Sequence, residues 1–267
     1  MRKVEIGDCT LYNGDAFEVL PMLGDESIDA VISDPPFGIT ACEWDKVPPL
    51  PLMWEILDAK TKPTANFVMF AAGGFTIDLV NSNRKWFRYD VIWAKNNRVG
   101  FMNANLMPMR AHESILVFGR PGFQKSAVYN PVKLPGGRPT IRRGRIREGT
   151  VYPTQNEGYT TVGDGTRHPC SVLAFSHDRQ NNQKGLNWHP TSKPITLMAY
   201  LAHTYSNPGD VILDPFMGSG TTAIACDKLH RRFIGIEKSE KFFDVACRRL
   251  IQEREKWARN RRLNGRS

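Results

Sequence analysis

Residues 213–222 have the sequence Leu-Asp-Pro-Phe-Met-Gly-Ser-Gly-Thr-Thr, in which a short apolar strand ends at an acidic residue and passes through two glycines into a helix. Glycine permits the tight turn that this connection needs and lets a ligand approach the main chain closely. The first N–H groups of the helix have no intrahelical partner, so they favour an anionic group at the turn. The stretch therefore predicts a strand–turn–helix unit that binds a small ligand.

The sequence that follows the turn extends this unit into a βαβ pattern. Apolar residues predict strands at 210–213 and 232–236, with a helix over 219–229 between them. Glu237 ends the second strand, 23 residues after Asp214. In nucleotide-binding folds an acidic residue about 20 residues beyond the first turn binds the ribose hydroxyls of the ligand. The spacing of the two carboxylates therefore fits a ribose.

Similar apolar runs in the N-terminal half predict the remainder of a parallel sheet. The run Ile28–Ile32 predicts a buried strand that ends at residues 33–36, because two consecutive prolines cannot continue a hydrogen-bonded ladder. We expect further strands at 66–71, 89–94 and 113–118. Strands that alternate with amphipathic stretches are typical of a sheet with helices on both faces.

The middle of the chain lacks this periodicity. Between about residues 121 and 187 it contains Pro-Gly turns, polar stretches and the basic run Gly137–Arg147. We interpret this region as an insertion on the surface of the core, and one long disordered loop is the alternative. The stretch 242–262 predicts a helix with a strongly basic outer face.

Composition narrows the classes of protein to which the chain can belong. The 267 residues are 41% hydrophobic and 24% charged, which excludes a fibrous or wholly disordered protein. The net charge of +9 favours polyanions, so nucleic acid is the first partner to consider. Five scattered cysteines without a CxxC pair argue against a zinc knuckle and fit a reducing cytoplasm. No apolar stretch approaches the ~18 residues of a membrane helix, and the N-terminus has no apolar signal segment.

The segment Ser33-Asp-Pro-Pro-Phe-Gly38 places hydrogen-bond acceptors beside an aromatic ring. Pro35 and Pro36 have no N–H and favour an extended backbone, which leaves the carbonyls of Asp34 and Pro35 free to accept. These acceptors and the ring of Phe37 suit an amino group on a flat heterocycle. The alternative is that the prolines only end the strand and that Phe37 belongs to the core.

Taken together, Asp34-Pro-Pro-Phe37 and Phe216-Met-Gly-Ser-Gly220 resemble the motifs of the amino-DNA methyltransferases. These enzymes transfer a methyl group from S-adenosylmethionine to the exocyclic amine of adenine or cytosine. Here the catalytic motif comes first and the cofactor motif follows 180 residues later (214 minus 34), an order that resembles the beta class. The resemblance implies a Rossmann-like α/β fold, with a seven-stranded sheet, helices on both faces and an inserted target-recognition region.

Further segments are similar to motifs of this family. Gly14-Asp15 resembles the acidic motif that binds the adenine of the cofactor, and His189–Pro194 resembles the helix-start motif beside its methionine moiety. Trp44-Asp45, Glu113–Phe118 and Arg167–Val172 resemble the intervening signatures. The resemblance implies a catalytic half at 1–120, target recognition at 121–188, and a cofactor-binding half with a basic C-terminal helix at 189–267.

The resemblance assigns roles to individual residues. The implied catalytic residues are Asp34, Pro35, Pro36 and Phe37. The implied cofactor-binding residues are Asp15, Lys193, Asp214, Phe216, Gly218, Gly220, Thr221 and Glu237. From the basic run we expect the residues that bind DNA phosphates to be Arg138, Arg142, Arg143 and Arg145. We expect no metal site, because no histidines form a close i, i+4 pair and none lies beside paired cysteines.

These roles imply a direct transfer. If the Asp34 carboxylate and the Pro35 carbonyl accept the N–H groups of the amine, its lone pair can point at the sulfonium methyl, and no covalent intermediate is needed. We expect Asp34 to be ionised at neutral pH. The target nucleotide must rotate out of the duplex, and stacking on Phe37 would contribute ~1–3 kcal/mol.

Adenine is the expected base, since family members with Asp at the first position are mostly adenine-N6 enzymes, whereas cytosine-N4 enzymes tend to have Ser there. Phe37 replaces the commoner Tyr and keeps the stacking face. Three alternatives stay open: a cytosine-N4 enzyme, a methyltransferase acting on RNA or on a protein glutamine, and a catalytically silent DNA-binding protein. A cytosine-C5 enzyme with Cys170 as nucleophile is disfavoured, because the other motifs of that group are missing.

The partner implied is double-stranded DNA, in the cytoplasm of a bacterium or a phage-infected host. A homodimer and a cognate restriction endonuclease are left open as further partners.

Overall fold

The computed structural model describes residues 1–40, 42–136, 138–143, 160–176 and 192–264. The chain divides into two compact units. The first, which we call the core unit, comprises Met1–Asn130 and Ser171–Ser267, and the second, the inserted unit, comprises Pro131–Cys170. Among the helices described, none combines the length and the apolar character that crossing a membrane requires.

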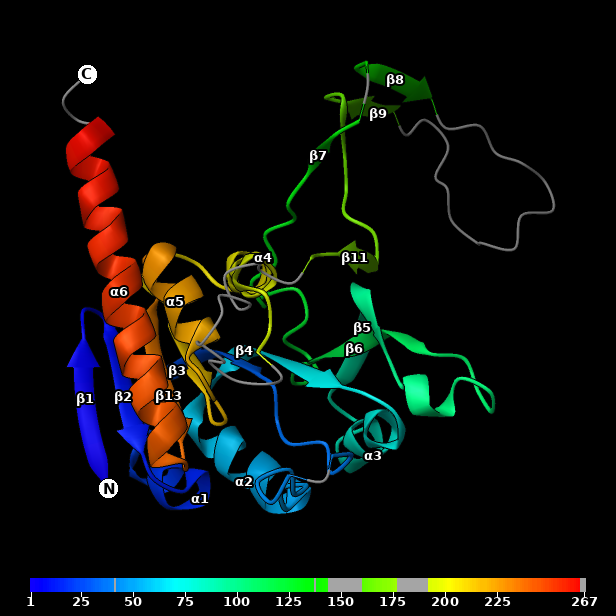
Figure 1. Ribbon diagram of the computed structural model, residues 1–267. Helices are drawn as coiled ribbons and strands as arrows, with labels where there is room; N and C mark the ends of the chain where they lie inside the picture. The colour runs from blue at the N-terminus through cyan, green and yellow to red at the C-terminus, as the bar shows by residue number, and fades with distance from the viewer. Residues whose placement is uncertain (41, 137, 144–159, 177–191, 265–267) are drawn as a thin grey trace. The chain divides into compact units, whose positions relative to one another are not determined.

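The core unit is built on one large sheet (Figure 1). The sheet has nine described strands in the order β1-β2-β13-β12-β3-β4-β6-β5-β11. Their bounds are β1 Arg2–Ile6, β2 Cys9–Asn13, β3 Ile28–Ser33, β4 Thr61–Ala71, β5 Phe87–Val99, β6 Arg110–Phe118, β11 Val172–Ala174, β12 Val211–Asp214 and β13 Arg232–Glu237. The run from β2 to β5 forms the predicted seven-stranded sheet, and β1 and β11 add one strand at each edge.

Most neighbours in this sheet are parallel, as predicted. The strands β2, β13, β12, β3 and β4 run in one direction, and β11 is parallel to β5. At one edge β1 is antiparallel to β2. Within the sheet β6 is antiparallel to both β4 and β5, which differs from the parallel arrangement that the sequence predicted. The reason is the short connection between β5 and β6, since a parallel crossover needs about a dozen residues or more. The strands predicted around both motifs are confirmed, and β4 and β5 are longer than expected.

Helices cover both faces of the sheet (Figure 1). One face carries α4 (Ile195–Tyr205), α5 (Thr221–Lys228) and α6 (Glu240–Asn264), and the other carries α1 (Ala16–Val19), α2 (Leu50–Lys60) and α3 (Gly74–Ser82). Side chains along a strand point alternately to the two faces. In β4, Val68 and Phe70 join the core under α4–α6, while Phe67 and Met69 join the core under α1–α3. Burial on both faces explains why the central strands are almost continuously apolar.

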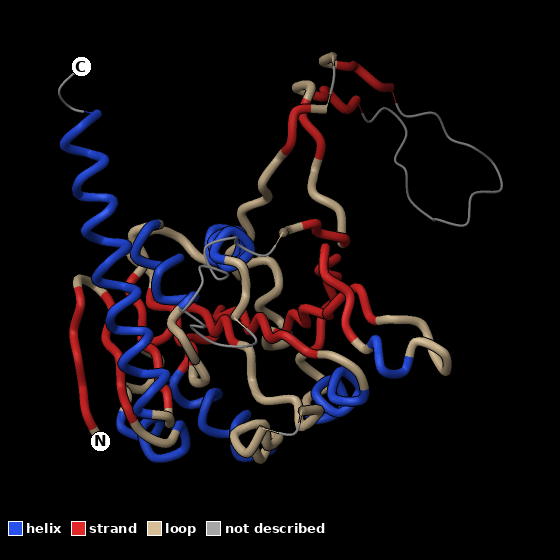
Figure 2. The backbone as a smooth tube through the Cα atoms, viewed as in Figure 1, coloured by secondary structure: helices blue, strands red, loops and turns tan. Residues whose placement is uncertain are grey.

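The described part of the inserted unit contains two small antiparallel ribbons (Figure 2). β7 (Leu134–Pro135) pairs with β10 (Thr166–Arg167), and β8 (Thr140–Arg143) pairs with β9 (Thr160–Gly163). The carboxylate of Asp164 organises the turn before β10 by accepting from the Thr166 N–H at 2.9 Å. The predicted insertion at 121–188 extends beyond this unit at both ends, and its residues 177–188 lie outside the described part of the chain.

The core unit anchors the residues at both ends of the insertion. The Asn130 N–H donates to the carbonyl of Thr204 at 2.8 Å, and its side-chain amide donates to the carbonyl of Ser206 at 3.0 Å. At the other end, the carbonyl of Ser171 accepts from the Ile92 N–H at 2.7 Å. The chain therefore leaves and re-enters the core at two fixed points.

Candidate active site

The two sequence motifs meet at the carboxyl ends of β3 and β12. These strands are parallel neighbours, with Leu213 opposite Val31. Each strand ends in an acidic segment, and the hydroxyl of Ser33 donates to Oδ1 of Asp214 at 2.7 Å. The sheet thus brings together residues separated by 181 positions in the chain. Ligands of open parallel sheets bind at this edge.

Asp214 is buried, and its carboxylate organises the surrounding backbone. Oδ2 accepts from the hydroxyl of Thr222 at 2.6 Å, and Oδ1 also accepts from the Phe216 N–H at 3.2 Å. Burial raises the pKa of Asp214 to about 6, and these hydrogen bonds oppose the shift. Asp214 therefore joins the end of β3, the glycine turn and the first turn of α5.

The glycine turn needs glycine for two separate reasons. Gly218 and Gly220 have φ values of +53° and +76°, in the left-handed region that side chains disfavour. A Cβ on Gly220 would also lie 2.8 Å from the Cβ of Ala246 in α6. The turn is therefore closely packed against α6 where α5 begins at Thr221.

A buried arginine of α6 holds the same turn. Nη1 of Arg249 donates to the carbonyl of Ser219 at 2.6 Å and lies 3.2 Å from Oγ1 of Thr221. The side chain of Arg249 is 5% exposed. Sequence analysis did not identify this residue, because it belongs to a helix in which basic residues are common and most are solvated.

The other predicted cofactor residues lie at the neighbouring strand ends. Glu237 ends β13 and is half-buried, and its Oε1 accepts from the Ser239 N–H at 2.7 Å. Burial raises the pKa of Glu237, while the N–H groups of Ser239 and Gly218 oppose the shift, so this carboxylate lies against the glycine turn. Asp15 follows β2 and caps α1 through the Phe17 N–H at 2.9 Å. Acidic residues thus follow four consecutive strands, β2, β13, β12 and β3.

Asp34 belongs to a buried row of alternating charges. Nζ of Lys193 lies 2.5 Å from Oδ2 of Asp34 and 3.3 Å from Oε2 of Glu113. Nζ of Lys95 lies 2.8 Å from Oε1 of Glu113. The resemblance implies that Lys193 binds the cofactor, and this stays a prediction; the ion pairs of Lys193 in the described residues are with these two carboxylates. Glu113 and Lys95 come from β6 and β5 and were not predicted as site residues.

The charges in this row determine the state of Asp34. Burial raises the pKa of Asp34 to about 6, and the ammonium group of Lys193 opposes this shift. Burial alone would lower the pKa of Lys193, but the carboxylates of Asp34 and Glu113 raise it above its ordinary value. Lys193 is therefore a cation and Asp34 is predominantly a carboxylate at neutral pH, as the sequence analysis expected.

One oxygen of Asp34 is available to a ligand. Oδ2 is held by Lys193, whereas Oδ1 is buried and has no hydrogen-bond partner among the described residues. A buried acceptor without a donor is costly, so such atoms in native proteins call for a functional explanation. Pro35 and Pro36 add no N–H groups that could occupy it. Oδ1 can therefore accept a hydrogen bond from a ligand.

A second buried aspartate holds the backbone that follows the tetrapeptide. Oδ1 of Asp45 accepts from the N–H groups of Phe37 and Gly38 at 2.8 and 2.9 Å. Oδ2 accepts from the N–H groups of Ile39 and Thr40 at 3.0 and 2.7 Å. One carboxylate therefore binds four consecutive backbone N–H groups, and Asp45 is only 7% exposed.

Phe37 is half-buried at the edge of the core. Its ring stacks on that of Phe75 with the centroids 5.2 Å apart and the planes at 25°. Nζ of Lys193 lies 5.7 Å from the centroid of the Phe37 ring. The ring is therefore fixed beside the charge row that contains Asp34.

Comparison with protein families agrees with this geometry. The family model of the N6/N4 type, described as "DNA methylase", matches residues 28–248, which include the tetrapeptide and the glycine turn. The chain belongs to this DNA methyltransferase family. M.BglII, a type II methyltransferase of Bacillus subtilis, is 26% identical to this chain. The alignment covers 91% of this chain and 69% of M.BglII. M.HinfI of Haemophilus influenzae, also a type II methyltransferase, is 27% identical over 94% of this chain and 71% of its own length.

Solved structures of similar proteins support the same fold. M1.HpyAVI, solved in complex with SAM, is 26% identical to this chain and has a TM-score of 0.58. The match covers 91% of this chain and 100% of M1.HpyAVI. The cytosine-N4-specific PvuII DNA methyltransferase has a TM-score of 0.63 over 90% of this chain and 85% of its own. Its identity of 17% supports the fold alone.

S-adenosylmethionine is the cofactor of the methyltransferase, as its complexes with similar proteins support. The residues of the methyltransferase fit this molecule. Gly218 and Gly220 have no side chain that would keep a ligand away from the main chain between β12 and α5. The half-buried carboxyl group of Glu237 beside them suits the hydroxyls of a ribose.

The residues predicted to bind DNA lie in or near β8. Arg138 is exposed and precedes the strand, and the backbone of Arg142 and Arg143 forms part of it. Arg145 lies outside the described residues.

No group of three or more potential metal ligands occurs among the described residues. His177 and His189 lie outside the described chain, and Cys170 is exposed.

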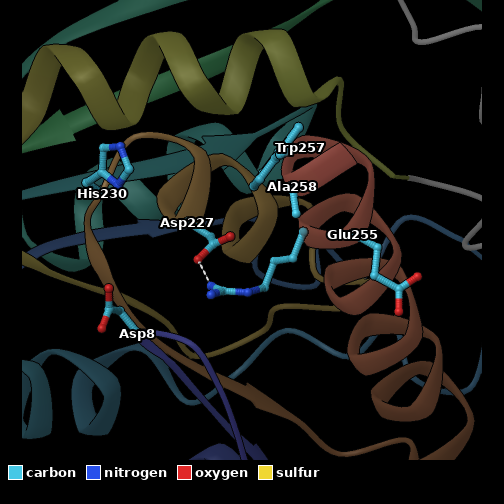
Figure 3. Close-up of a pocket in the computed structure, with 7 residues that line it drawn as sticks. Asp8, Asp227, His230, Glu255, Trp257 and Ala258 are labelled. Carbon is cyan, nitrogen blue, oxygen red and sulfur yellow. Dashed lines mark hydrogen bonds and ion pairs between the residues drawn. The ribbon is translucent and has the colours of Figure 1, made fainter. Parts of the chain in front are cut away.

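A pocket of about 680 Å³ on the core unit is lined by Asp8, Asp227, His230 and Trp257, among others (Figure 3). Asp227 and His230 precede β13, whereas Glu237 ends it. The pocket therefore lies at the amino end of β13, and the candidate active site lies at its carboxyl end.

Proposed function

We propose that the protein is a site-specific DNA methyltransferase that modifies the N6 amine of adenine in duplex DNA. The buried oxygen Oδ1 of Asp34 carries this proposal, because it has no partner among the described residues and lies at the end of β3, next to the strand that leads into the glycine turn. The aspartate at the first position of the tetrapeptide favours adenine over cytosine.

Asp34 activates the amine by accepting one of its hydrogen bonds. The lone pair of the N6 nitrogen is delocalised into the purine ring, which makes the amine a poor nucleophile. An N–H donated to Oδ1 of Asp34 and another donated to the carbonyl of Pro35 draw the nitrogen toward tetrahedral geometry. Lys193 holds Oδ2 at 2.5 Å, so Oδ1 keeps one orientation throughout the reaction. Fixed acceptors of this kind stabilise the charge that develops on the amine.

The remaining residues position the two reactants. S-adenosylmethionine, when bound, would supply the electrophilic methyl group for a direct displacement, in which the N–C bond forms as the S–C bond breaks, a neutral thioether leaves and the amine releases one proton. Gly218, Gly220 and Glu237 would hold it at the ends of β12 and β13. Phe37 stacks on the target base after the nucleotide has rotated out of the duplex. Asp45 keeps the backbone of Phe37 in place through the hydrogen bonds described above.

The inserted unit, with the chain that flanks it, recognises the DNA target. Its arginines at 138, 142, 143 and 145 bind phosphates, which positions the enzyme without reading sequence. Base recognition lies in the same region. The enzyme then acts in the cytoplasm as the modification component of a type II system.

The test follows a labelled methyl group into DNA. Purified protein is incubated with mixed-sequence duplex DNA and methyl-labelled S-adenosylmethionine, and the nucleosides are separated by chromatography. We expect label in N6-methyladenine, and its complete loss in Asp34→Ala but not in Asp78→Ala, an exposed aspartate of α3. Label in N4-methylcytosine would contradict the choice of base. A protein that binds duplex DNA but does not transfer methyl groups would contradict the proposal as a whole.

A further inference from the structure

The connection between β5 and β6 exposes an unusual concentration of apolar side chains. Within residues 99–107, which we call the apolar loop, Phe101, Met102 and Leu106 are 78%, 93% and 82% exposed. Val99 and Met107 are exposed as well. Figure 1 shows this connection, with its short 3-10 turn at Phe101–Asn103, extending beyond the ends of β5 and β6. Contiguous exposed apolar surface of this kind marks an interaction site.

The charges around the apolar loop indicate an anionic partner. No acidic residue occurs between Asp90 and Glu113, whereas Arg98 and Arg110 flank the loop. Arg98 is exposed and Arg110 is partly exposed. Two copies of the chain in contact through this loop would bring the same cations together. Duplex DNA offers phosphates to the arginines and a stacked apolar interior to the side chains between them.

The strand β6 connects the apolar loop to the charge row that contains Asp34. In the ladder of β5 and β6, Trp93 lies opposite Glu113 and Val99 lies opposite Arg110. Glu113 contacts Lys193, which contacts Asp34. Arg110 precedes Glu113 by three residues, or about 10 Å of extended strand at ~3.4 Å per residue. This distance corresponds to about three stacked base steps at ~3.4 Å each.

We propose that the apolar loop enters the DNA duplex beside the target nucleotide and fills the space that the flipped base leaves. Phe, Leu and Met are the side chains with which other DNA-binding proteins separate stacked base pairs. Phe101, Met102 and Leu106 would contact the bases, while Arg98 and Arg110 would bind the adjacent phosphates. The inference rests on the proposed function, since only an enzyme that flips its target base leaves such a space.

The experiment compares two variants of similar polarity change. In the first, Phe101→Ser, Met102→Ser and Leu106→Ser are combined. In the control, Met22→Ser and Ile251→Ser alter exposed apolar residues elsewhere in the core unit. Methylation-sensitive sequencing of DNA from an expressing host first identifies the target site. Base flipping is then measured by the fluorescence of 2-aminopurine placed at the target adenine. In a second measurement, kcat/KM is determined on an intact duplex and on a duplex with an abasic site opposite the target.

We expect the loop variant to lose the fluorescence increase and to lose roughly ten-fold or more in kcat/KM on the intact duplex, because flipping becomes less favourable. On the abasic duplex, where the target base is already unpaired, it should match the control variant. Equal behaviour of both variants on both substrates would overturn the inference while leaving the proposed function intact. The wild-type protein could also be a dimer that becomes monomeric in the loop variant while base flipping is unchanged. That result would identify the loop as a contact between copies and would also overturn the inference. Failure of the wild-type enzyme to methylate any DNA would refute the proposed function itself.

Discussion

Ser33 and Asp214 are joined by a hydrogen bond of 2.7 Å between the hydroxyl of one and the carboxylate of the other. Ser33 is the last residue of β3 and precedes the tetrapeptide Asp34–Phe37, for which we propose a catalytic role, whereas Asp214 ends β12 and begins the glycine turn. Because β3 and β12 are adjacent and parallel, this bond sets the relative position of the two motifs. The proposed site of amine activation and the proposed cofactor site therefore share the carboxyl ends of two adjacent strands.

The first prediction concerns pH. Burial raises the pKa of Asp34 to about 6, so the carboxylate required for the reaction is protonated below this value. We expect kcat/KM for DNA to be constant near neutral pH and to fall about ten-fold per pH unit well below pH 6. The raised pKa also means that the folded state binds the proton more tightly, so the contribution of Asp34 to stability decreases as pH rises from about 4 toward 6. Steady-state rates between pH 5 and 8 test the prediction, and a flat profile down to pH 5 would contradict it.

Lys193 should determine the pH below which kcat/KM falls, which we call the acid limb of the profile. Lys193→Met removes the ammonium group that opposes the effect of burial on Asp34, so the pKa of Asp34 should rise and the limb should move to higher pH. Lys95→Met is the matched control, since Lys95 contacts Glu113 but not Asp34 in the described structure. We expect a clear upward displacement of the pH–rate profile in the first variant and a smaller one in the second. Identical profiles would show that Lys193 does not influence Asp34.

Asp45 should affect catalysis through the backbone of Phe37. In Asp45→Asn the amide group has one acceptor oxygen in place of two, and its NH2 group faces N–H donors. Loss of charge-assisted hydrogen bonds should lower the free energy of unfolding by about 1–3 kcal/mol. Because the loop carries the aromatic ring of the site, kcat should fall while the Kd for S-adenosylmethionine stays within about three-fold. Glu43→Gln, an exposed acid in the same loop, is the control. A loss of cofactor affinity with unchanged kcat would contradict this role.

Gly220→Ala separates two kinds of strain in the glycine turn. The new Cβ would lie 2.8 Å from Ala246 and would occupy a residue with φ of +76°. Gly209→Ala is a matched control, because Gly209 has φ of +86° and nothing within 4 Å of an added Cβ. The backbone conformation should cost about 1–3 kcal/mol in both variants. The contact with α6 should add about 1–3 kcal/mol in Gly220→Ala only, together with weaker cofactor binding. Thermal unfolding and calorimetric titration with S-adenosylmethionine measure the two effects.

The sequence allowed prediction of the sheet around both motifs, because local signals are strong there. Two prolines end β3 after residue 33, and the glycines that begin α5 follow an apolar strand directly. The direction of β6 was not predictable in the same way, since an apolar run of this length carries no information about orientation. The connection at residues 100–109 is too short for a parallel crossover. The strands predicted at 89–94 and 113–118 left a longer gap, so this signal appears only with the bounds that the structure gives.

The charge row around Asp34 could not be derived from the sequence. Its members come from the segment after β3, from β5, from β6 and from the residue before Pro194, so only the folded sheet brings them together. Trp44-Asp45 resembled an intervening signature of the family, but nothing in the sequence assigned a role to Asp45, because its four backbone partners are set by the fold of the loop. Arg249 left none, because nothing local distinguishes it from the other basic residues of α6.

The hydrogen bonds at Asn130 and Ser171 have a consequence for the evolution of such enzymes. Both junctions are held by hydrogen bonds within the core unit, and these bonds use no side chain from the described residues of the intervening segment. If the inserted unit recognises the target, as we propose, its exchange between related genes at these two points would replace the recognition segment and leave Asp34, Asp214 and Glu237 unchanged. New target sites could then arise in one step from an active enzyme.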